Sequence, residues 1–135
     1  MLKFNTETKR WSNGSDVPLE GNDLKYYEYS AVVHGKEVFY FGGRVGYSQN
    51  KIFRYRIESD QWKLMGTLQQ NRYAHSAIQQ ANGFTIIGGN GNFYHEYCYF
   101  STDDLDQMEC EKKMQRLNGY AYYPELVHVH DNFCQ

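Results

Sequence analysis

The sequence predicts an all-β chain built from four-stranded antiparallel sheets that repeat along its length, and three observations support this prediction. Short apolar runs of strand length alternate with turn residues through most of the 135 residues. The same landmarks return at a regular interval. Aromatic residues make up 17% of the chain, with 13 tyrosines, a composition that favours strands with half-buried faces.

The interval between the landmarks is 46 residues, since Ser30 corresponds to Ser76 and 76 − 30 = 46. The matching stretches are Ser30-Ala31-Val32 with Ser76-Ala77-Ile78, and Phe41-Gly42-Gly43 with Ile87-Gly88-Gly89. Trp11 and Trp62 are 62 − 11 = 51 residues apart, so the first interval carries an insertion, and Met108 replaces the tryptophan in the next copy. A repeat of this length is typical of a four-stranded propeller blade.

These landmarks resemble the kelch repeat. The shared features are a double glycine after an apolar strand, an aromatic residue ahead of the first strand and a tryptophan in the last strand. The stretch from Trp62 to Ala77 is also similar to the family's pattern between that tryptophan and the next first strand. The resemblance covers nearly the whole chain and implies an all-β, kelch-like β-propeller in the form of an incomplete array of blades. It gives a structural role in the repeat to Trp11, Gly42, Gly43, Trp62, Gly88 and Gly89.

The repeat divides the chain into two full and two partial blades. We expect the end of a blade at 1–12, full blades at 27–65 and 73–112, and the start of a blade at 120–135. The strands expected in the full blades are Tyr27–Val33, Glu37–Phe41, Lys51–Ile57, Gln61–Met65, Ala74–Gln79, Phe84–Ile87, Tyr94–Ser101 and Gln107–Lys112. Hairpin turns are predicted at His34-Gly35 and Asn82-Gly83. Closed propellers have about four to eight blades, so we expect a fragment of a longer protein, or copies that complete one another by self-association.

The composition argues against several classes of partner. The net charge of −2 gives no support for binding nucleic acid or an anionic membrane. No apolar run approaches the ~18 residues of a membrane span, and the first residues lack the apolar run of a signal peptide. We therefore expect a cytoplasmic protein.

The three cysteines are too few for a disulfide framework. Cys98 and Cys110 fall on the third and fourth strands of the second full blade, where they could face each other across a hairpin. The favoured interpretation is two buried thiols. The alternative is a cross-strand disulfide, which would place the protein in an oxidising, extracellular compartment.

Little in the sequence indicates catalysis or metal binding. His128 and His130 lie two apart on a predicted strand and so on one face, a spacing that could supply two ligands to a metal, but no other cluster of histidine appears. The sequence contains neither a phosphate-binding loop nor a nucleophile elbow. We expect no cofactor and no enzymatic activity. The kelch family does include copper-radical enzymes of the galactose oxidase type, so part of a propeller enzyme is an alternative.

The resemblance implies a protein-binding module. Partners of kelch propellers commonly dock on loops that join strands two and three and on loops between blades. Arg72 matches a recurring kelch position, so we expect a structural role for it. His75 takes the place of Tyr29 in the preceding unit, so we expect a packed polar aromatic side chain. Arginine and aromatic residues are the usual anchors of an interface, and those in the predicted loops are Arg44, Tyr47, Phe93, Tyr94, His95, Arg116 and Tyr120. A structural partial propeller that self-associates is a further alternative.

Overall fold

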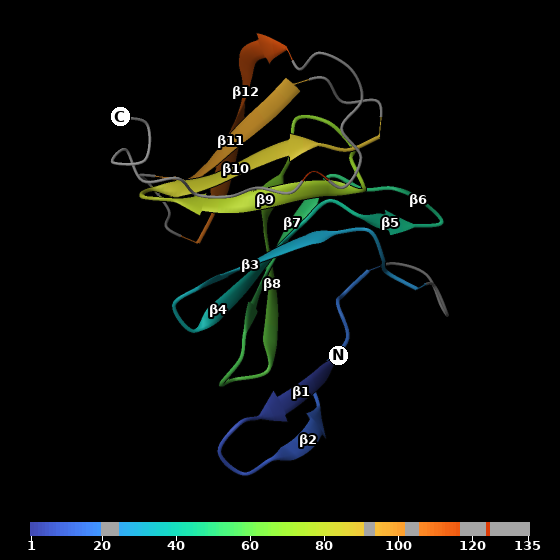
Figure 1. The fold of residues 1–135 in the computed structure, drawn as a ribbon, viewed down its shortest axis with the longest axis vertical. Coiled ribbons are helices and arrows are strands. Elements are labelled where there is room, and N and C mark those ends of the chain that lie inside the picture. Colours follow the sequence, from blue (N-terminus) through green and yellow to red (C-terminus); the bar gives the residue numbers. More distant parts are fainter. Residues whose placement is uncertain (20–24, 91–93, 102–105, 117–123, 125–135) are drawn as a thin grey trace.

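The computed structural model describes residues 1–19, 25–90, 94–101, 106–116 and 124, with only the backbone for 114–116 (Figure 1). These residues form strands and turns and contain no helix, which confirms the all-β prediction. None of them therefore belongs to a helix that could span a membrane.

Two four-stranded antiparallel sheets make up most of the molecule (Figure 1). The first has the order β3-β4-β7-β8, with β3 at Ser30–His34, β4 at Glu37–Phe41, β7 at Lys51–Arg56 and β8 at Gln61–Thr67. The second has the order β9-β10-β11-β12, with β9 at His75–Gln80, β10 at Gly83–Gly88, β11 at Tyr94–Phe100 and β12 at Met108–Arg116. The two sheets are thus successive copies of one unit with the same strand order.

Two small hairpins accompany these sheets. The N-terminal hairpin pairs β1 (Leu2–Asn5) with β2 (Arg10–Asn13) and lies at the bottom of Figure 1. The other pairs β5 (Arg44–Val45) with β6 (Tyr47–Ser48), inside the loop that joins β4 to β7. The sequence predicts the first hairpin as the end of a blade, but it does not predict the second hairpin.

The strand bounds differ from the predicted ones in ways that have local causes. The first strand was expected from Tyr27, but β3 begins at Ser30. Glu28 has a positive φ of 55°, which takes the chain out of the extended region, and Tyr27 pairs with Arg44 in an isolated bridge instead. At the other end, β12 continues to Arg116.

Both predicted hairpin turns are displaced by one residue. His34 pairs with Glu37, so the turn is Gly35-Lys36. Gln80 pairs with Gly83, so the turn is Ala81-Asn82. The predicted start of a blade at 120–135 lies outside the described residues, apart from Pro124.

Side chains of β4 alternate between two cores, as expected for a strand packed on both faces. Phe39 and Phe41 point into the core between the two large sheets, whereas Tyr40 points toward the N-terminal hairpin and the segment after it. The core between the sheets contains Phe39, Phe41, Ile52, Met65, Leu68, Phe84, Ile86, Cys98, Met108 and Cys110. Each large sheet is therefore stabilised mainly by the unit beside it.

The double glycine at the end of β4 lies where other groups approach closely. A Cβ atom on Gly42 would lie 2.4 Å from the carbonyl oxygen of Arg72, and one on Gly43 would lie 2.6 Å from the ring of Tyr26. Both glycines also have positive φ values, of 56° and 98°. The equivalent Gly89, at φ 97°, would bring a Cβ atom to 2.8 Å from the carbonyl oxygen of Tyr73. A side chain at any of these positions would force the neighbouring segment away.

The two tryptophans of the repeat have unlike surroundings. Trp62 packs against Tyr40 and Tyr55, with ring centroids 5.0 and 4.7 Å apart, and its Nε1 donates a hydrogen bond to the carbonyl of Ser15. Trp11 is 67% exposed and contacts the ring of Phe4. The difference follows from the number of neighbours, because Trp62 lies between two units and Trp11 lies on a two-stranded hairpin.

An ion pair between successive units also repeats. Asp60, in the turn between β7 and β8, binds Lys3 of the preceding hairpin at 3.1 Å. Asp106, ahead of β12, binds Arg54 of the preceding sheet at 2.8 Å. Lys3 and Arg54 are 54 − 3 = 51 residues apart, the same interval that separates the two tryptophans. Each aspartate therefore links its own unit to the one before it.

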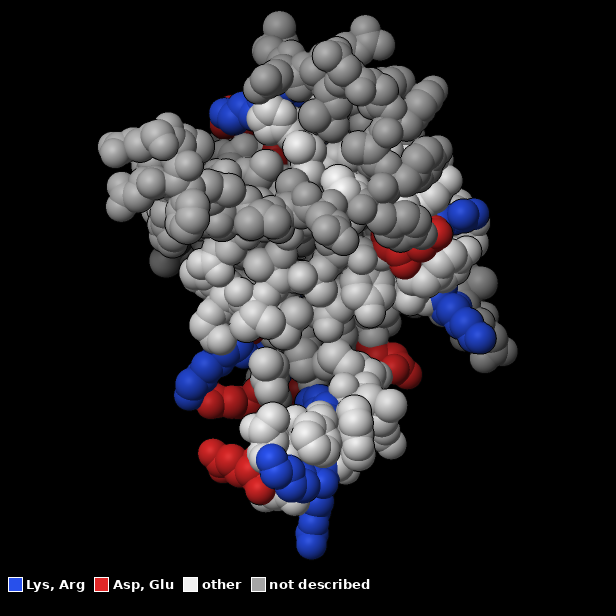
Figure 2. Space-filling model, viewed as in Figure 1, with Lys and Arg blue, Asp and Glu red and all other residues white. Residues whose placement is uncertain are grey.

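These contacts hold both carboxyl groups in the ionised form. A hydrogen bond from the Tyr55 hydroxyl, with others from the Ser15 amide and Lys3, lowers the pKa of Asp60 to about 2. Lys63, followed by Arg54, lowers the pKa of Asp106 to about 2. Figure 2 shows acidic and basic side chains lying beside one another near the N-terminal hairpin, rather than gathered by sign.

Candidate functional site

Each large sheet has two ends, and those predicted binding residues that the structure describes belong to one of them. The first strand runs antiparallel to the second, so Ser30 and Phe41 lie at one end of the first sheet, and His34 and Glu37 lie at the other. We call the end that carries residues 42–50 and 68–74 the loop end. The opposite end, which carries the turns at 35–36 and 81–82, is the turn end.

The hairpin β5–β6 shapes the loop end of the first sheet. Gly46 occupies its tip with a φ of 70°, a conformation that suits glycine. The hairpin closes with a backbone hydrogen bond of 2.8 Å from Gln49 to the carbonyl of Gly43. Tyr47 follows the tip and is 69% exposed, the highest value among the large hydrophobic side chains described. This predicted anchor is therefore held out on a short, backbone-bonded hairpin.

Arg44 starts the same hairpin but is engaged within the chain. Its guanidinium carbon lies 4.7 Å from the ring centroid of Tyr73 and 5.7 Å from that of Tyr27. Its Nη1 lies 3.7 Å from a carboxylate oxygen of Glu28. These cation–π and charge contacts orient Arg44 between the first strand and the loop between the blades, and about a third of its side chain stays exposed.

Two further tyrosines at the loop end were not expected there. Tyr27 and Tyr29 are each 41% exposed, although the sequence analysis assigned both to the first strand. Tyr29 stacks on Tyr26 at 4.6 Å and meets Tyr40 edge to face at 5.1 Å. The close spacing of tyrosines in residues 26–29 could have indicated an exposed aromatic cluster, but Tyr27 and Tyr29 were assigned to a strand.

Three further predicted residues, Tyr94, His95 and Arg116, belong to the second sheet. Tyr94 and His95 begin β11 and are half-buried, and the Lys112 ammonium lies 4.3 Å from the ring centroid of Tyr94. The Arg116 backbone pairs with Tyr94. Phe93 and Tyr120 lie outside the described residues. The structure therefore brings Arg44 and Tyr47 into one hairpin and Tyr94 opposite Arg116 on another sheet.

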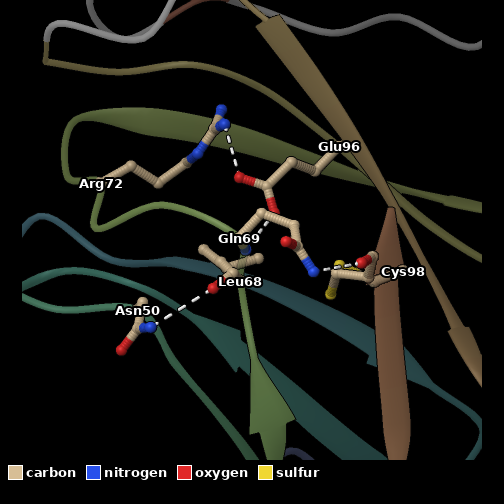
Figure 3. The surroundings of a disulfide bond; sticks show 7 residues. Asn50, Leu68, Gln69, Arg72, Glu96 and Cys98 are labelled. Carbon is tan, nitrogen blue, oxygen red and sulfur yellow. Dashed lines mark hydrogen bonds and ion pairs between the residues drawn. A yellow bond between two sulfur atoms is a disulfide. The ribbon is translucent and has the colours of Figure 1, made fainter. Parts of the chain in front are cut away.

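A buried ion pair between Arg72 and Glu96 lies behind the loops of the loop end (Figure 3). Arg72 and Glu96 are both fully buried, with Nη2 and Oε1 2.7 Å apart. Arg72 also donates from Nη1 to the carbonyl of Gly88, and the other carboxylate oxygen of Glu96 accepts from the Gln69 amide at 2.7 Å. The loop between the blades is thus fixed to the second sheet by charge-assisted hydrogen bonds, which are the stronger kind.

Side-chain amides extend this support to both sheets. Gln69 donates from Nε2 to the carbonyl of Cys110 at 2.7 Å, and Asn50 donates from Nδ2 to the carbonyl of Leu68 at 3.3 Å (Figure 3). The backbone amide of Leu68 in turn donates to the carbonyl of Asn50 at 2.7 Å. The loop after β6 is therefore bonded to the loop between the blades.

His75 lies beneath the same loops and is 4% exposed. Burial, followed by the positive charge of Arg72, lowers the pKa of His75 to about 3. The imidazole is neutral at physiological pH. It is a packed aromatic side chain, as the sequence analysis expected.

The structure joins Cys98 and Cys110 in a disulfide, which corrects the favoured interpretation of two separate thiols. The two residues are directly opposite in the pairing of β11 with β12, and their Cα atoms are 4.1 Å apart. Both side chains belong to the core between the sheets. The spacing of the cysteines indicated that they face each other, but it could not show that they bond.

The part of the chain that the structure describes contains no group of three or more His, Cys, Asp and Glu side chains that could hold a metal ion. His128 and His130, which the sequence analysis considered as metal ligands, lie outside it.

Comparison with known proteins identifies the class of the chain. The family model of the kelch motif matches residues 25–69, which include the first four-stranded sheet. The chain carries kelch repeats, and its two large sheets are kelch-type blades of an all-β, propeller-type array.

The relatives come from two groups of proteins. The chain is 23% identical to Kelch-like protein 25 of Xenopus tropicalis over 107 residues, covering 79% of this chain and 16% of that protein. It is 26% identical to Kelch-like protein 25 of Rattus norvegicus over 81 residues, covering 60% of this chain and 12% of that protein. It is 30% identical to the leucine-zipper-like transcriptional regulator 1 homolog of Drosophila melanogaster over 104 residues, covering 68% of this chain and 10% of that protein. The chain thus spans only a small part of the length of each relative.

Proposed function

We propose that this chain is a protein-binding module that contacts its partner with the loop end of its blades. The observation that carries the proposal is Tyr47, a large aromatic side chain that is 69% exposed on a rigid hairpin. Tyrosine and arginine are enriched among the residues that dominate binding energy at interfaces. Tyr27 and Tyr29 add exposed aromatic surface at the same end, and Arg44 lies between the two groups.

The support beneath these residues favours binding without rearrangement. Arg72 and Glu96 fix the loop between the blades, and backbone hydrogen bonds fix the β5–β6 hairpin. A preorganised surface loses less conformational entropy when a partner docks. We propose the same role for Tyr94, His95, Phe93, Arg116 and Tyr120. We also propose that the chain acts as part of a longer kelch protein.

Site-specific crosslinking tests the proposal. Two variants of the chain are made, with a photoreactive phenylalanine analogue at position 47 in the first and at position 64 in the second. Leu64 is a matched control because it is also exposed, at 50%, but lies on the outer strand β8. We expect one protein to be captured through position 47 and not through position 64.

The captured protein then provides a quantitative test with purified components. We expect Tyr47→Ala to weaken binding at least tenfold, as for an interface anchor, and Leu64→Ala to leave the dissociation constant unchanged. Equal crosslinking at both positions, or equal affinity of the two variants, would contradict a binding site at the loop end.

A second candidate function is self-association, and the N-terminal hairpin favours it. Leu2 and Trp11 are 68% and 67% exposed on a sheet of only two strands, and Phe4 is exposed beside them. An apolar sheet face of this kind is a site for pairing with another chain. Light scattering on the wild type and on a Leu2→Ser/Trp11→Ser variant tests the idea. A wild-type protein that stays monomeric over a 100-fold range of concentration would exclude self-association.

A further inference from the structure

A cavity of about 260 Å³ opens at the turn end, away from the loops that the proposed function uses. It lies between the first turns of the two sheets. Its lining residues are His34, Ala81, Asn82, Gly83, Phe84 and Phe100. The sequence predicts turns and strands for these residues but no binding role, because the lining residues of the second sheet are distant in sequence from His34 of the first.

The walls of the cavity are aromatic rings in fixed positions. The ring of His34 lies 6.1 Å from that of Phe84 and 6.0 Å from that of Phe100, measured between centroids. Phe84 is fully buried and also packs on Phe39 at 5.0 Å. The cavity is therefore part of the contact between the two sheets rather than a gap between mobile side chains.

A glycine keeps the strands close where the cavity ends. A Cβ atom on Gly83 would lie 2.1 Å from the carbonyl oxygen of Cys98, so β10 approaches β11 there more closely than any other residue would allow. Cys98 is joined to Cys110 by the disulfide. The wall of the cavity that belongs to the second sheet is therefore rigid.

The size and chemistry of the cavity define one kind of occupant. Drug-sized ligands occupy pockets of about 300–1,000 Å³, whereas a cavity of about 150 Å³ accommodates a benzene ring. A volume of about 260 Å³ therefore suits a single large ring. None of the described lining residues is Asp, Glu, Lys or Arg, so a charged group would find no opposite charge among them. The His34 imidazole and the exposed Asn82 amide offer hydrogen bonds to one polar atom on the ring.

The other cavity described at this end differs in each of these respects. It has a volume of about 440 Å³ and is lined mostly by charged residues. Those charges are already paired within the chain, since Asp106 binds Arg54 at 2.8 Å and Lys63 at 2.7 Å. These ion pairs link the two sheets. We therefore assign no ligand to this cavity.

We propose that the cavity lined by His34, Asn82, Phe84 and Phe100 receives one aromatic side chain with a polar atom, a tyrosine or a tryptophan, from a protein that contacts the turn end. The ring packs against the phenylalanine rings, where edge-to-face contacts are favourable. Its hydroxyl or N–H group hydrogen bonds to His34 or Asn82. The chain then has a second contact surface, at the end opposite Tyr47.

Nuclear magnetic resonance titrations with p-cresol and indole test the proposal on the 135-residue chain. The two compounds represent the side chains of tyrosine and tryptophan. We expect saturable shifts at His34, Asn82 and Phe100, with dissociation constants on the order of 1 mM for ligands of this size. The two probes should compete with each other. Acetate and guanidinium, which are charged, should produce no saturable shifts at these residues.

Three variants localise the binding. His34→Ala removes one wall and should weaken binding of both probes at least fivefold. Asn82→Ala changes only an exposed side chain, so it keeps the fold and should weaken p-cresol severalfold. Leu64→Ala is the matched control, because Leu64 is exposed on β8 and does not line the cavity, and it should bind the probes as the wild type does.

Several results would overturn the proposal. They are an absence of saturable shifts, shifts centred on Tyr27 and Tyr47, wild-type affinity in both the His34→Ala and the Asn82→Ala variants, or equal binding of the charged probes. Shifts of the same residues on raising the protein concentration without any probe would assign the cavity to a second copy of the chain instead. The crosslinking at position 47 tests protein binding at the loop end separately, because Tyr47 does not line the cavity.

Discussion

Replacing Glu96 with glutamine tests whether the buried ion pair beneath the loop end holds the two sheets together. Glutamine keeps the size of the side chain and one acceptor oxygen, but it leaves the Arg72 guanidinium without a counter-charge where both side chains are fully buried. Breaking one partner of a buried pair costs about 3–5 kcal/mol. Because a domain is stabilised by only about 5–15 kcal/mol, we expect this single change to remove a large part of the stability.

A double-mutant cycle separates the charge from the rest of the network. Arg72→Met should also cost about 3–5 kcal/mol, because it leaves the Glu96 carboxylate buried and unpaired. In Arg72→Met/Glu96→Gln no charge remains, and the loss should come from the carbonyls of Gly88 and Tyr94, which Arg72 serves at 2.9 and 3.2 Å. A buried acceptor without a partner costs about 1–3 kcal/mol. The double variant should therefore lose less than the two single losses combined.

Urea unfolding at pH 7, followed by circular dichroism, measures these free energies. The surface pair of Lys36 and Glu58 is the control, since its charged atoms are 2.6 Å apart but both side chains are mostly exposed. Glu58→Gln should leave the unfolding midpoint unchanged. If the unfolding free energies lost by the two single variants add up, within about 0.5 kcal/mol, to the loss of the double variant, the reasoning is refuted, because independent sites are additive.

Three further predictions concern stability. Reducing the Cys98–Cys110 bond, which closes a sequence separation of 12 residues, should lower the free energy of unfolding by about 3 kcal/mol; thiol alkylation and mass spectrometry before and after reduction check that the bond is present. The folded pKa of His75, about 3, lies below its ordinary value of 6.5, so stability should fall as the pH drops from about 6.5 toward 3, at about 1.4 kcal/mol per unit at most. The variant His75→Asn should flatten that slope, and an unchanged slope would show that other groups cause it. Asp106→Asn should lower the melting temperature less in 1 M salt than at low salt, since salt screens the ion pairs that it removes; a loss independent of salt would contradict an electrostatic role.

The sequence could predict features that depend on local periodicity. The nearly continuous apolar run of β4 is typical of a strand buried on both faces, and Phe39 and Tyr40 do point to different cores. The double glycine signals positive φ values and a close approach, which the structure shows at Gly42 and Gly43. Tyr47 was recognised as a candidate because a loop between strands favours exposure.

Other features escaped the sequence because they depend on partners from another unit. The contacts of Arg44 with Tyr73 and Glu28 were not predicted, because both partners lie far from it in the sequence. The start of β3 was misplaced because Glu28 adopts a positive φ, which residue type alone does not reveal. His34 was expected in a hairpin turn, and its packing against Phe84 of the next sheet was not predicted.

The amino-acid sequence by itself determined the strand pattern, the 46-residue repeat and the kelch character of the blades, because burial alternates with a period of two along each strand and turns favour few residue types. The tertiary structure decided which side chains meet across the blades, including the Arg72–Glu96 pair, the disulfide and the turn-end cavity. Contacts between units depend on the distance and angle at which one sheet packs on the next. A sequence repeat indicates that similar sheets lie beside one another, but only the packing of those sheets determines which atoms are in contact.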